Sequence, residues 1–186
     1  MASFELTSDS TQRLQDATAL LQKHGWDPQQ GPALVVLGAE QRMFGLGGAF
    51  PPEGWPVSTG EAGFGNVVDS GRTPTGLHRI CACIGDGAPI GMVFKSREPT
   101  GEIVSPAGAL DGDFITTRIL WLEGMEEGVN RGPGVDSRER YIYIHGTPHV
   151  HQLGQPVSKG CVRMDDRDVL TLYPLISLHT PVLILA

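Results

Sequence analysis

The stretch from Tyr141 to Met164 reads YIYIHGTPHVHQLGQPVSKGCVRM, and it decides both the fold class and the chemistry that we expect of this chain. Its first residues alternate between apolar and other side chains, as a strand does, and the strand ends at His145-Gly146-Thr147. A loop follows, and then comes Ser158-Lys159-Gly160-Cys161-Val162-Arg163. A histidine at a strand end and a cysteine directly after a glycine suggest a nucleophile and its base.

Cys161 is the predicted nucleophile, and His145 is the predicted base. A free thiol has a pKa near ~8.5 and is mostly protonated at neutral pH, whereas attack requires the thiolate. An imidazole at hydrogen-bond distance takes the proton and leaves an ion pair. Lys159 and Arg163 add positive charge beside the thiol. No acidic residue stands at a spacing that would orient His145, so the nearest backbone carbonyl, that of Gly146, is the candidate for this role.

Gly160 has a second predicted role, because glycine lets the backbone turn tightly and expose successive N–H groups. The N–H groups of Lys159, Gly160 and Cys161 are the candidate donors of an oxyanion hole. One such donor typically lowers the barrier by ~3 kcal/mol.

These residues closely resemble the catalytic motif of the L,D-transpeptidase family, which has a YkuD-type catalytic domain. That motif runs from His-Gly-Thr through a loop to Ser/Thr-His-Gly-Cys, a hydrophobic residue and Arg or Asn. Lys159 stands here where histidine is commoner, which leaves His145 as the imidazole within the motif pattern. The resemblance covers roughly residues 31–186, and it extends to Thr73-Pro74-Thr75-Gly76, Thr117–Leu122, Asn130-Arg131, Asp136–Arg138 and Asp168–Tyr173.

The resemblance implies a mainly β fold with a few helices and a β-sandwich-like catalytic domain over residues 31–186. The helical spacing of apolar residues near the N-terminus adds a helical extension over residues 1–30. The resemblance implies Cys161 as nucleophile, His145 as base and the Gly146 carbonyl as its orienting group. It also implies a peptidoglycan tetrapeptide or muropeptide as substrate, cleaved between meso-diaminopimelate and the terminal D-alanine. The candidate substrate-binding residues are Arg163, which would hold a carboxylate as a fork, Ser158 and Arg118.

Composition limits the other classes of function. The chain has 186 residues with 25 glycines and 14 prolines, which favours one domain of short strands and turns. Its net charge of −7 argues against nucleic acid and anionic membranes as general partners, although a local basic pocket for an anionic substrate stays compatible with it. No apolar run reaches the ~20 residues of a membrane span. The first residues show no signal peptide, so we expect a cytoplasmic location, or a periplasmic one through another export route.

Periodicity places the elements. It predicts an amphipathic helix over residues 10–24, a second helix from Asp165 or Asp166, and strands over 33–37, 41–46, 55–59, 77–84, 90–95, 114–122, 141–145 and 180–185. Residues 96–113 are rich in turn formers and predict a long loop. Cys81 and Cys83 are two apart in a strand, which predicts two buried thiols on one face.

Several alternatives remain at this point. With His145 and Cys161, His149 and His151 would make a zinc site of nitrogen and sulfur ligands, although no metal or cofactor is the preferred expectation. Arg163 would otherwise pair with Asp165 or Asp166. If water accepts the acyl group, the enzyme is an L,D-carboxypeptidase of peptidoglycan recycling, and this is the outcome we favour. If another stem peptide accepts it, a 3→3 crosslink forms. A non-catalytic stem-peptide binding module and a secreted toxin acting on wall precursors are the other hypotheses.

Overall fold

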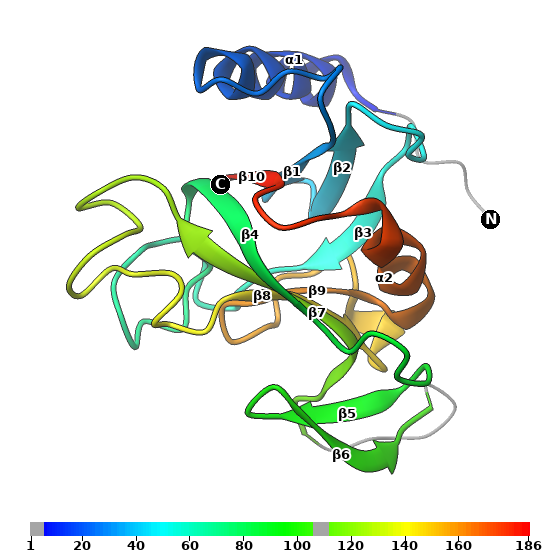
Figure 1. Cartoon of the computed structure of the whole chain (residues 1–186). Helices are drawn as coiled ribbons and strands as arrows, with labels where there is room; N and C mark the ends of the chain where they lie inside the picture. The colour runs from blue at the N-terminus through cyan, green and yellow to red at the C-terminus, as the bar shows by residue number, and fades with distance from the viewer. Residues whose placement is uncertain (1–5, 106–111) are drawn as a thin grey trace.

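The computed structural model describes residues 6–105 and 112–186, which form two α-helices and one sheet of ten strands (Figure 1). The helices are α1 Ser8–Lys23 and α2 Asp166–Leu172, and single 3-10 turns cover Val150–Gln152 and Tyr173–Leu175. The strands are β1 Ala33–Leu37, β2 Arg42–Leu46, β3 Trp55–Ser58, β4 Gly76–Ile84, β5 Met92–Lys95, β6 Glu98–Ile103, β7 Ile115–Gly124, β8 Tyr143–Thr147, β9 Val162–Asp165 and β10 Pro181–Leu185.

The sheet curls until its two halves face each other. Its strand order is β4-β10-β1-β2-β3-β9-β8-β7-β5-β6, and β4 pairs with β7 as well, which closes the ring. Alternate side chains of the strands that form the ring point inward and are largely buried, and side chains of α2 join this interior. The interior includes Leu34, Val36, Ile80, Leu120, Leu122, Ile144, Val162, Met164, Val169, Leu172, Val182 and Ile184. The predicted mainly β, sandwich-like architecture is confirmed.

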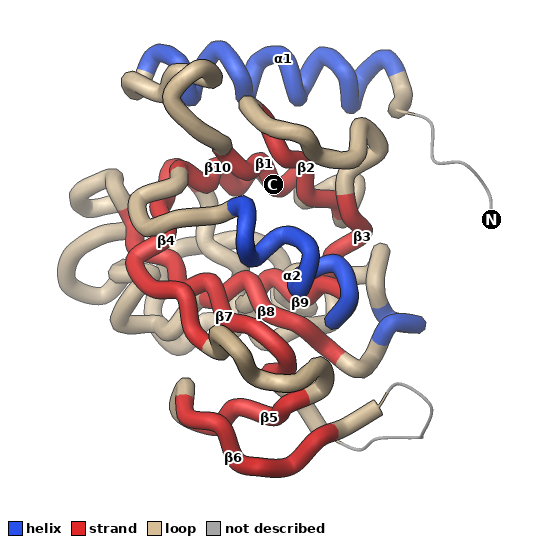
Figure 2. Tube along the Cα trace, turned by 45° about the vertical axis from the view of Figure 1, so that its right-hand side comes forward, coloured by secondary structure: helices blue, strands red, loops and turns tan. Residues whose placement is uncertain are grey.

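Helix α1 covers the outer face of β1 and β10. Thr7 caps it by accepting a hydrogen bond from the Ser10 backbone N–H, and Ala17 and Leu21 are buried against this face. In both views α1 lies at one end of the molecule and the β5–β6 hairpin at the other (Figures 1 and 2). Neither helix in the described ranges has the length and apolar character that a membrane span requires.

The β5–β6 hairpin corrects one prediction. We expected residues 96–113 to be a loop, but β6 occupies Glu98–Ile103 and pairs with β5 in antiparallel register. The turn between them consists of Ser96 and Arg97, whose φ angles are 51° and 71°. Two successive left-handed residues are the geometry of a tight hairpin turn whose twist matches the flanking strands. Residues 106–111 of the expected loop lie outside the described residues.

The two cysteines of β4 correct a second prediction, that of two buried thiols on one face of a strand. The register of β4 against β7 shifts between Ile80 and Ala82, so Cys81 is the extra residue of a β-bulge. Cys83 then packs against the interior, while Ala82 pairs with Trp121. Both thiols are partly exposed, so the prediction of two buried thiols was wrong.

Candidate active site

His145 and Cys161 lie on one face of two neighbouring parallel strands. The register pairs His145 of β8 with Arg163 of β9. Because side chains alternate along a strand, Cys161 projects from the same face as Arg163, and so do His145 and Tyr143 of β8. This is the outer face of the sheet, where Cys161 packs beside Tyr143 and Ile119. The parallel pairing therefore brings together two side chains that a loop separates in sequence.

A backbone carbonyl fixes the histidine ring. His145 is 2% exposed, and its Nδ1 lies 2.8 Å from the carbonyl oxygen of Gly146. A carbonyl only accepts hydrogen bonds, so the proton of the neutral ring is on Nδ1 and the lone pair is on Nε2. In this tautomer Nε2 can receive a proton, as a general base requires.

Both groups are neutral at pH 7. Burial lowers the pKa of His145 to about 4, and this effect exceeds that of the hydrogen bond to Gly146, which raises the pKa. Burial raises the pKa of Cys161 to about 11, while the hydrogen bond from the Tyr143 N–H and the charge of Arg163 lower it. Sγ accepts from the Tyr143 N–H at 3.4 Å and donates to the Tyr141 carbonyl at 3.5 Å. Within the described residues Sγ bonds to these two backbone groups and not to His145, so the ion pair expected from a Cys161–His145 hydrogen bond is not formed in this arrangement.

The loop before Cys161 is held by two hydroxyl groups. Ser158 Oγ donates to the Cys161 carbonyl at 2.6 Å and accepts from the Gly160 N–H at 3.1 Å. Thr73 Oγ1 donates to the Gly160 carbonyl at 2.9 Å. Ser158 thus shapes the loop, and its predicted role in substrate binding stays a prediction.

These contacts also change the predicted oxyanion hole. The Gly160 N–H is occupied by Ser158 because Gly160, with a φ of 117°, turns it back into the loop. Within the described residues, the N–H groups of Lys159 and Cys161 make no hydrogen bond. Two of the three predicted donors remain free to bind an oxyanion, and the exposed Lys159 side chain is not needed for this.

Arg163 is buried and paired, but neither Asp165 nor Asp166 is its partner. Its Nη2 lies 2.7 Å from Asp113 Oδ1, and Nη1 donates to Gln152 Oε1 at 3.3 Å. Its side chain is about 6% exposed. A substrate carboxylate would have to displace Asp113 before Arg163 could bind it, so the predicted fork is already occupied.

Arg118 points away from the thiol. In β7, Ile119 pairs with His145, so the neighbouring Arg118 projects from the other face of the sheet. There Nη1 donates to the Ala88 carbonyl at 2.8 Å, and the guanidinium lies 5.3 Å from the centre of the Tyr173 ring. Arg118 is buried and bonds to the backbone of the domain, and its predicted role in substrate binding stays a prediction.

Comparison with known proteins identifies the family of this chain. The sequence model of the YkuD family, described as the L,D-transpeptidase catalytic domain, matches residues 32–184. The chain belongs to the L,D-transpeptidase catalytic domain family. Among curated proteins, no sequence matches it significantly.

Solved structures show the same fold. L,D-transpeptidase 3 from Mycobacterium tuberculosis, crystallised with a faropenem-derived adduct, is 18% identical, with 84% of this chain and 61% of that chain covered and a TM-score of 0.52. A second crystal structure of that protein is 17% identical, with 84% of this chain and 62% of that chain covered and a TM-score of 0.52. An L,D-transpeptidase from Mycobacterium smegmatis is 17% identical, with 84% of this chain and 59% of that chain covered and a TM-score of 0.49. This chain spans about three fifths of the solved chains that it matches.

The zinc hypothesis is not supported by the geometry of this L,D-transpeptidase domain. His149 Nε2 lies 2.9 Å from the Gly112 carbonyl, and its ring packs against Phe114 and His151. Across residues 6–105 and 112–186, no three histidine, cysteine or acidic side chains gather as metal ligands.

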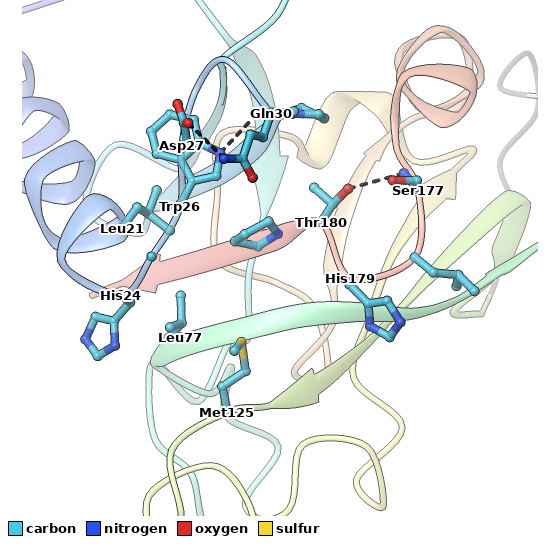
Figure 3. A pocket seen from close by; sticks show the side chains of 15 residues that line it. Leu21, His24, Trp26, Asp27, Gln30, Leu77, Met125, Ser177, His179 and Thr180 are labelled. Carbon is cyan, nitrogen blue, oxygen red and sulfur yellow. Dashed lines mark hydrogen bonds between the residues drawn. The ribbon is translucent and has the colours of Figure 1, made fainter.

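A hollow at the opposite end of the domain lacks the chemistry of the motif. It has a volume of about 280 Å³ and lies between the α1–β1 connection and the start of β10 (Figure 3). Its polar groups largely bond to one another, as Trp26 Nε1 does with the Gly31 carbonyl and Gln30 with Asp27 (Figure 3). None of the motif residues lines it, so the candidate active site is the face that carries Cys161.

Gly146 is required for a reason that the motif does not reveal. A Cβ at this position would lie 2.2 Å from Asp166 Oδ1 and 2.7 Å from the Thr116 carbonyl oxygen. Asp166 is 3% exposed and held by the Thr116 and Thr117 hydroxyls, so it has little room to move. The carbonyl that orients His145 therefore belongs to a residue without a side chain.

We expect Gly146→Ala to lower the free energy of unfolding by about 1–3 kcal/mol, the usual cost of forcing an atom into a packed site. Activity should fall too, because the shifted carbonyl no longer holds the ring of His145. Urea unfolding measures the first effect. Gly65→Ala is the matched control, since its Cβ would meet only the flexible side chain of Arg72, at 3.0 Å. Equal, small losses in both variants would contradict the packing account.

Sequence reasoning missed four residues that build this site: Asp113, Tyr143, Thr73 and Tyr141. Thr73 stood within a recognised family feature, but its bond to Gly160 joins distant segments. Asp113 gave no signal, because its pairing with Arg163 arises only when β9 and the segment before β7 meet. Tyr143 was visible as the strand position before His145 that faces the same way.

Proposed function

We propose that this domain transfers the acyl group of a peptidoglycan stem tetrapeptide through a thioester on Cys161, cleaving the bond between meso-diaminopimelate and D-alanine. One observation carries the proposal: His145, fixed through Nδ1 by the Gly146 carbonyl, shares one strand face with Cys161. Membership of the L,D-transpeptidase family supports the class of substrate.

In the first step His145 acts as a general base. The thiol turns from the Tyr141 carbonyl, and Nε2 takes its proton as Sγ attacks the scissile carbonyl carbon. The N–H groups of Lys159 and Cys161 stabilise the oxyanion. The carbon–nitrogen bond then breaks, His145 returns the proton to the amine, and D-alanine leaves a thioester on Cys161.

In the second step water is the acceptor that we propose. His145 removes a proton from water, the hydroxide attacks the thioester, and Sγ leaves and recovers the proton. The support is electrostatic, because a net charge of −7 disfavours approach to a polyanionic wall more than to a small soluble fragment. This L,D-carboxypeptidase outcome goes with a cytoplasmic location, which cell fractionation tests.

Product analysis tests the proposal. The protein is incubated with a soluble muropeptide tetrapeptide, and the products are separated and weighed. We expect D-alanine and tripeptide. Dimer formation, or efficient exchange of D-amino acids at the terminal position, would instead identify a transpeptidase. Binding without any product would identify a stem-peptide binding module.

The reactivity of Cys161 should depend on pH as that of a neutral thiol does. Since its pKa is raised to about 11, the thiolate fraction rises about tenfold for each pH unit between 6 and 9. We expect the rate of alkylation by iodoacetamide to rise in proportion, without a plateau. Mass spectrometry of the peptide that contains Cys161 measures this rate.

A preformed thiolate–imidazolium pair behaves differently, because its thiolate persists across neutral pH. A rate that stays constant from pH 6 to 8 would therefore contradict the neutral resting site. Cys83 is the internal reference, since it is also partly exposed and has a pKa that burial raises.

A further inference from the structure

Arg97 lies at the tip of the β5–β6 hairpin, on an aromatic surface beside the candidate active site. Its guanidinium carbon is 4.8 Å from the ring centre of Trp121 and 4.9 Å from that of Tyr141. Its Nη1 donates to the Tyr143 hydroxyl at 3.1 Å. Three aromatic side chains from β7, β8 and the segment before β8 thus fix the position of one cation.

The guanidinium keeps most of its donors free. Stacking on an aromatic face uses the face of the guanidinium and leaves the N–H groups at its edge available. The bond to Tyr143 is the one hydrogen bond that Arg97 makes within the described residues, and no carboxylate pairs with it there. Arg163 is the opposite case, since Asp113 and Gln152 occupy it.

A single tyrosine connects Arg97 to the thiol. The Tyr143 backbone N–H donates to Cys161 Sγ, and its side chain projects from the same face toward Arg97. Arg138 lies over the same Trp121 ring at 5.7 Å, which adds a second positive charge. Two guanidinium groups therefore lie over one aromatic ring at the edge of the site, and the carboxylates of Glu123, Asp136 and Glu139 line the hollow beside it.

We infer that Arg97 binds a carboxylate of the acyl donor and so makes the domain selective for acidic stem peptides; this inference rests on the proposed function. The edge of the stacked guanidinium receives the carboxylate as a fork while the substrate backbone lies over Tyr143 and Cys161. The carboxylate comes from one of three positions: the terminal D-alanine, the free carboxyl of diaminopimelate, or the D-glutamate that precedes it. The hairpin is thereby a specificity element.

The test combines protein variants with amidated substrates. Arg97→Gln is compared with wild type on the tetrapeptide and on three forms, each with one of these carboxylates converted to an amide. Lys95→Gln is the matched control, because it removes the same charge from the same hairpin at an exposed site. We expect Arg97→Gln to lower kcat/KM about 10- to 100-fold, the range for a charge-assisted hydrogen bond, and Lys95→Gln to change it less than about twofold.

The amides separate binding from a merely structural role. One amide should lower kcat/KM of wild type as much as Arg97→Gln does, and it should cause no further loss in that variant. The identity of this amide names the carboxylate. If Arg97→Gln lowers kcat/KM by the same factor on all four substrates, the inference is overturned. It is also overturned if Lys95→Gln lowers kcat/KM as much as Arg97→Gln does.

A binding measurement keeps this test independent of turnover. Calorimetry with Cys161→Ala protein measures Kd for the tetrapeptide, with and without Arg97→Gln. We expect Kd to rise about 10- to 100-fold when Arg97 is replaced. If wild type releases no D-alanine but Kd still shifts, the proposed function fails and the inference stands. Absence of tetrapeptide binding, or an unchanged Kd, overturns the inference.

Discussion

Replacing Cys161 by alanine is expected to abolish release of D-alanine from a tetrapeptide, to below about 10⁻⁴ of the wild-type rate. Without Sγ no thioester forms, and the free N–H groups of Lys159 and Cys161 have no tetrahedral intermediate to stabilise. Chromatography of released D-alanine measures the loss.

Cys83→Ala is the matched control for this variant. It removes a partly exposed thiol of the same domain from a strand outside the motif. Circular dichroism establishes that both variants fold. Residual turnover by a folded Cys161→Ala protein would show that another group carries the chemistry.

Replacing His145 by glutamine is expected to lower kcat about 10²- to 10⁴-fold, the usual contribution of a positioned general base. The thiol has a pKa raised to about 11, so without an acceptor for its proton little thiolate forms at neutral pH. The loss should shrink at high pH, because hydroxide then removes the proton that His145 no longer takes. Rates between pH 7 and 10 measure this convergence.

His149→Gln is the control that also tests the zinc hypothesis. His149 is buried like His145 and bonds a backbone carbonyl, but it lies beyond the strand. We expect it to keep most of the activity. A chelator-sensitive enzyme in which His149→Gln is as inactive as His145→Gln would contradict the assignment of His145 as the base.

The fold could be predicted to the extent that local patterns determine it. Alternating apolar residues identified most strands, and a helical pattern identified α1. The pattern could not identify β6, since all six of its residues are exposed and it has no apolar alternation. Its turn also lacks the Asn-Gly or Asp-Gly signal, because Ser96 and Arg97 adopt the left-handed conformation in their place. The bulge at Cys81 was hidden for a similar reason, as a register shift leaves no mark in one strand alone.

The site also consists of residues that a local pattern predicts and of contacts that only the tertiary structure determines. His145, Gly146 and Cys161 are read from the motif, and the parallel register of β8 and β9 explains why they meet. The partners of the arginines depend on tertiary structure. Arg163 pairs with Asp113, and the guanidinium of Arg118 lies over the ring of Tyr173. Arg97, which no sequence pattern singled out, lies on the aromatic surface beside the thiol. Charge alone therefore did not indicate that Arg163 is already paired with Asp113.

Mass spectrometry of the peptide that contains Cys161, sampled during turnover, tests the central claim most directly. Wild-type protein is mixed with tetrapeptide, quenched in acid within seconds and digested, and the peptide that contains Cys161 is weighed. We expect this peptide to carry the tripeptide acyl group as a thioester, with the D-alanine released equal to the sum of the thioester and the free tripeptide. Release of D-alanine while Cys161 stays unmodified, and an equal rate from Cys161→Ala, would contradict it.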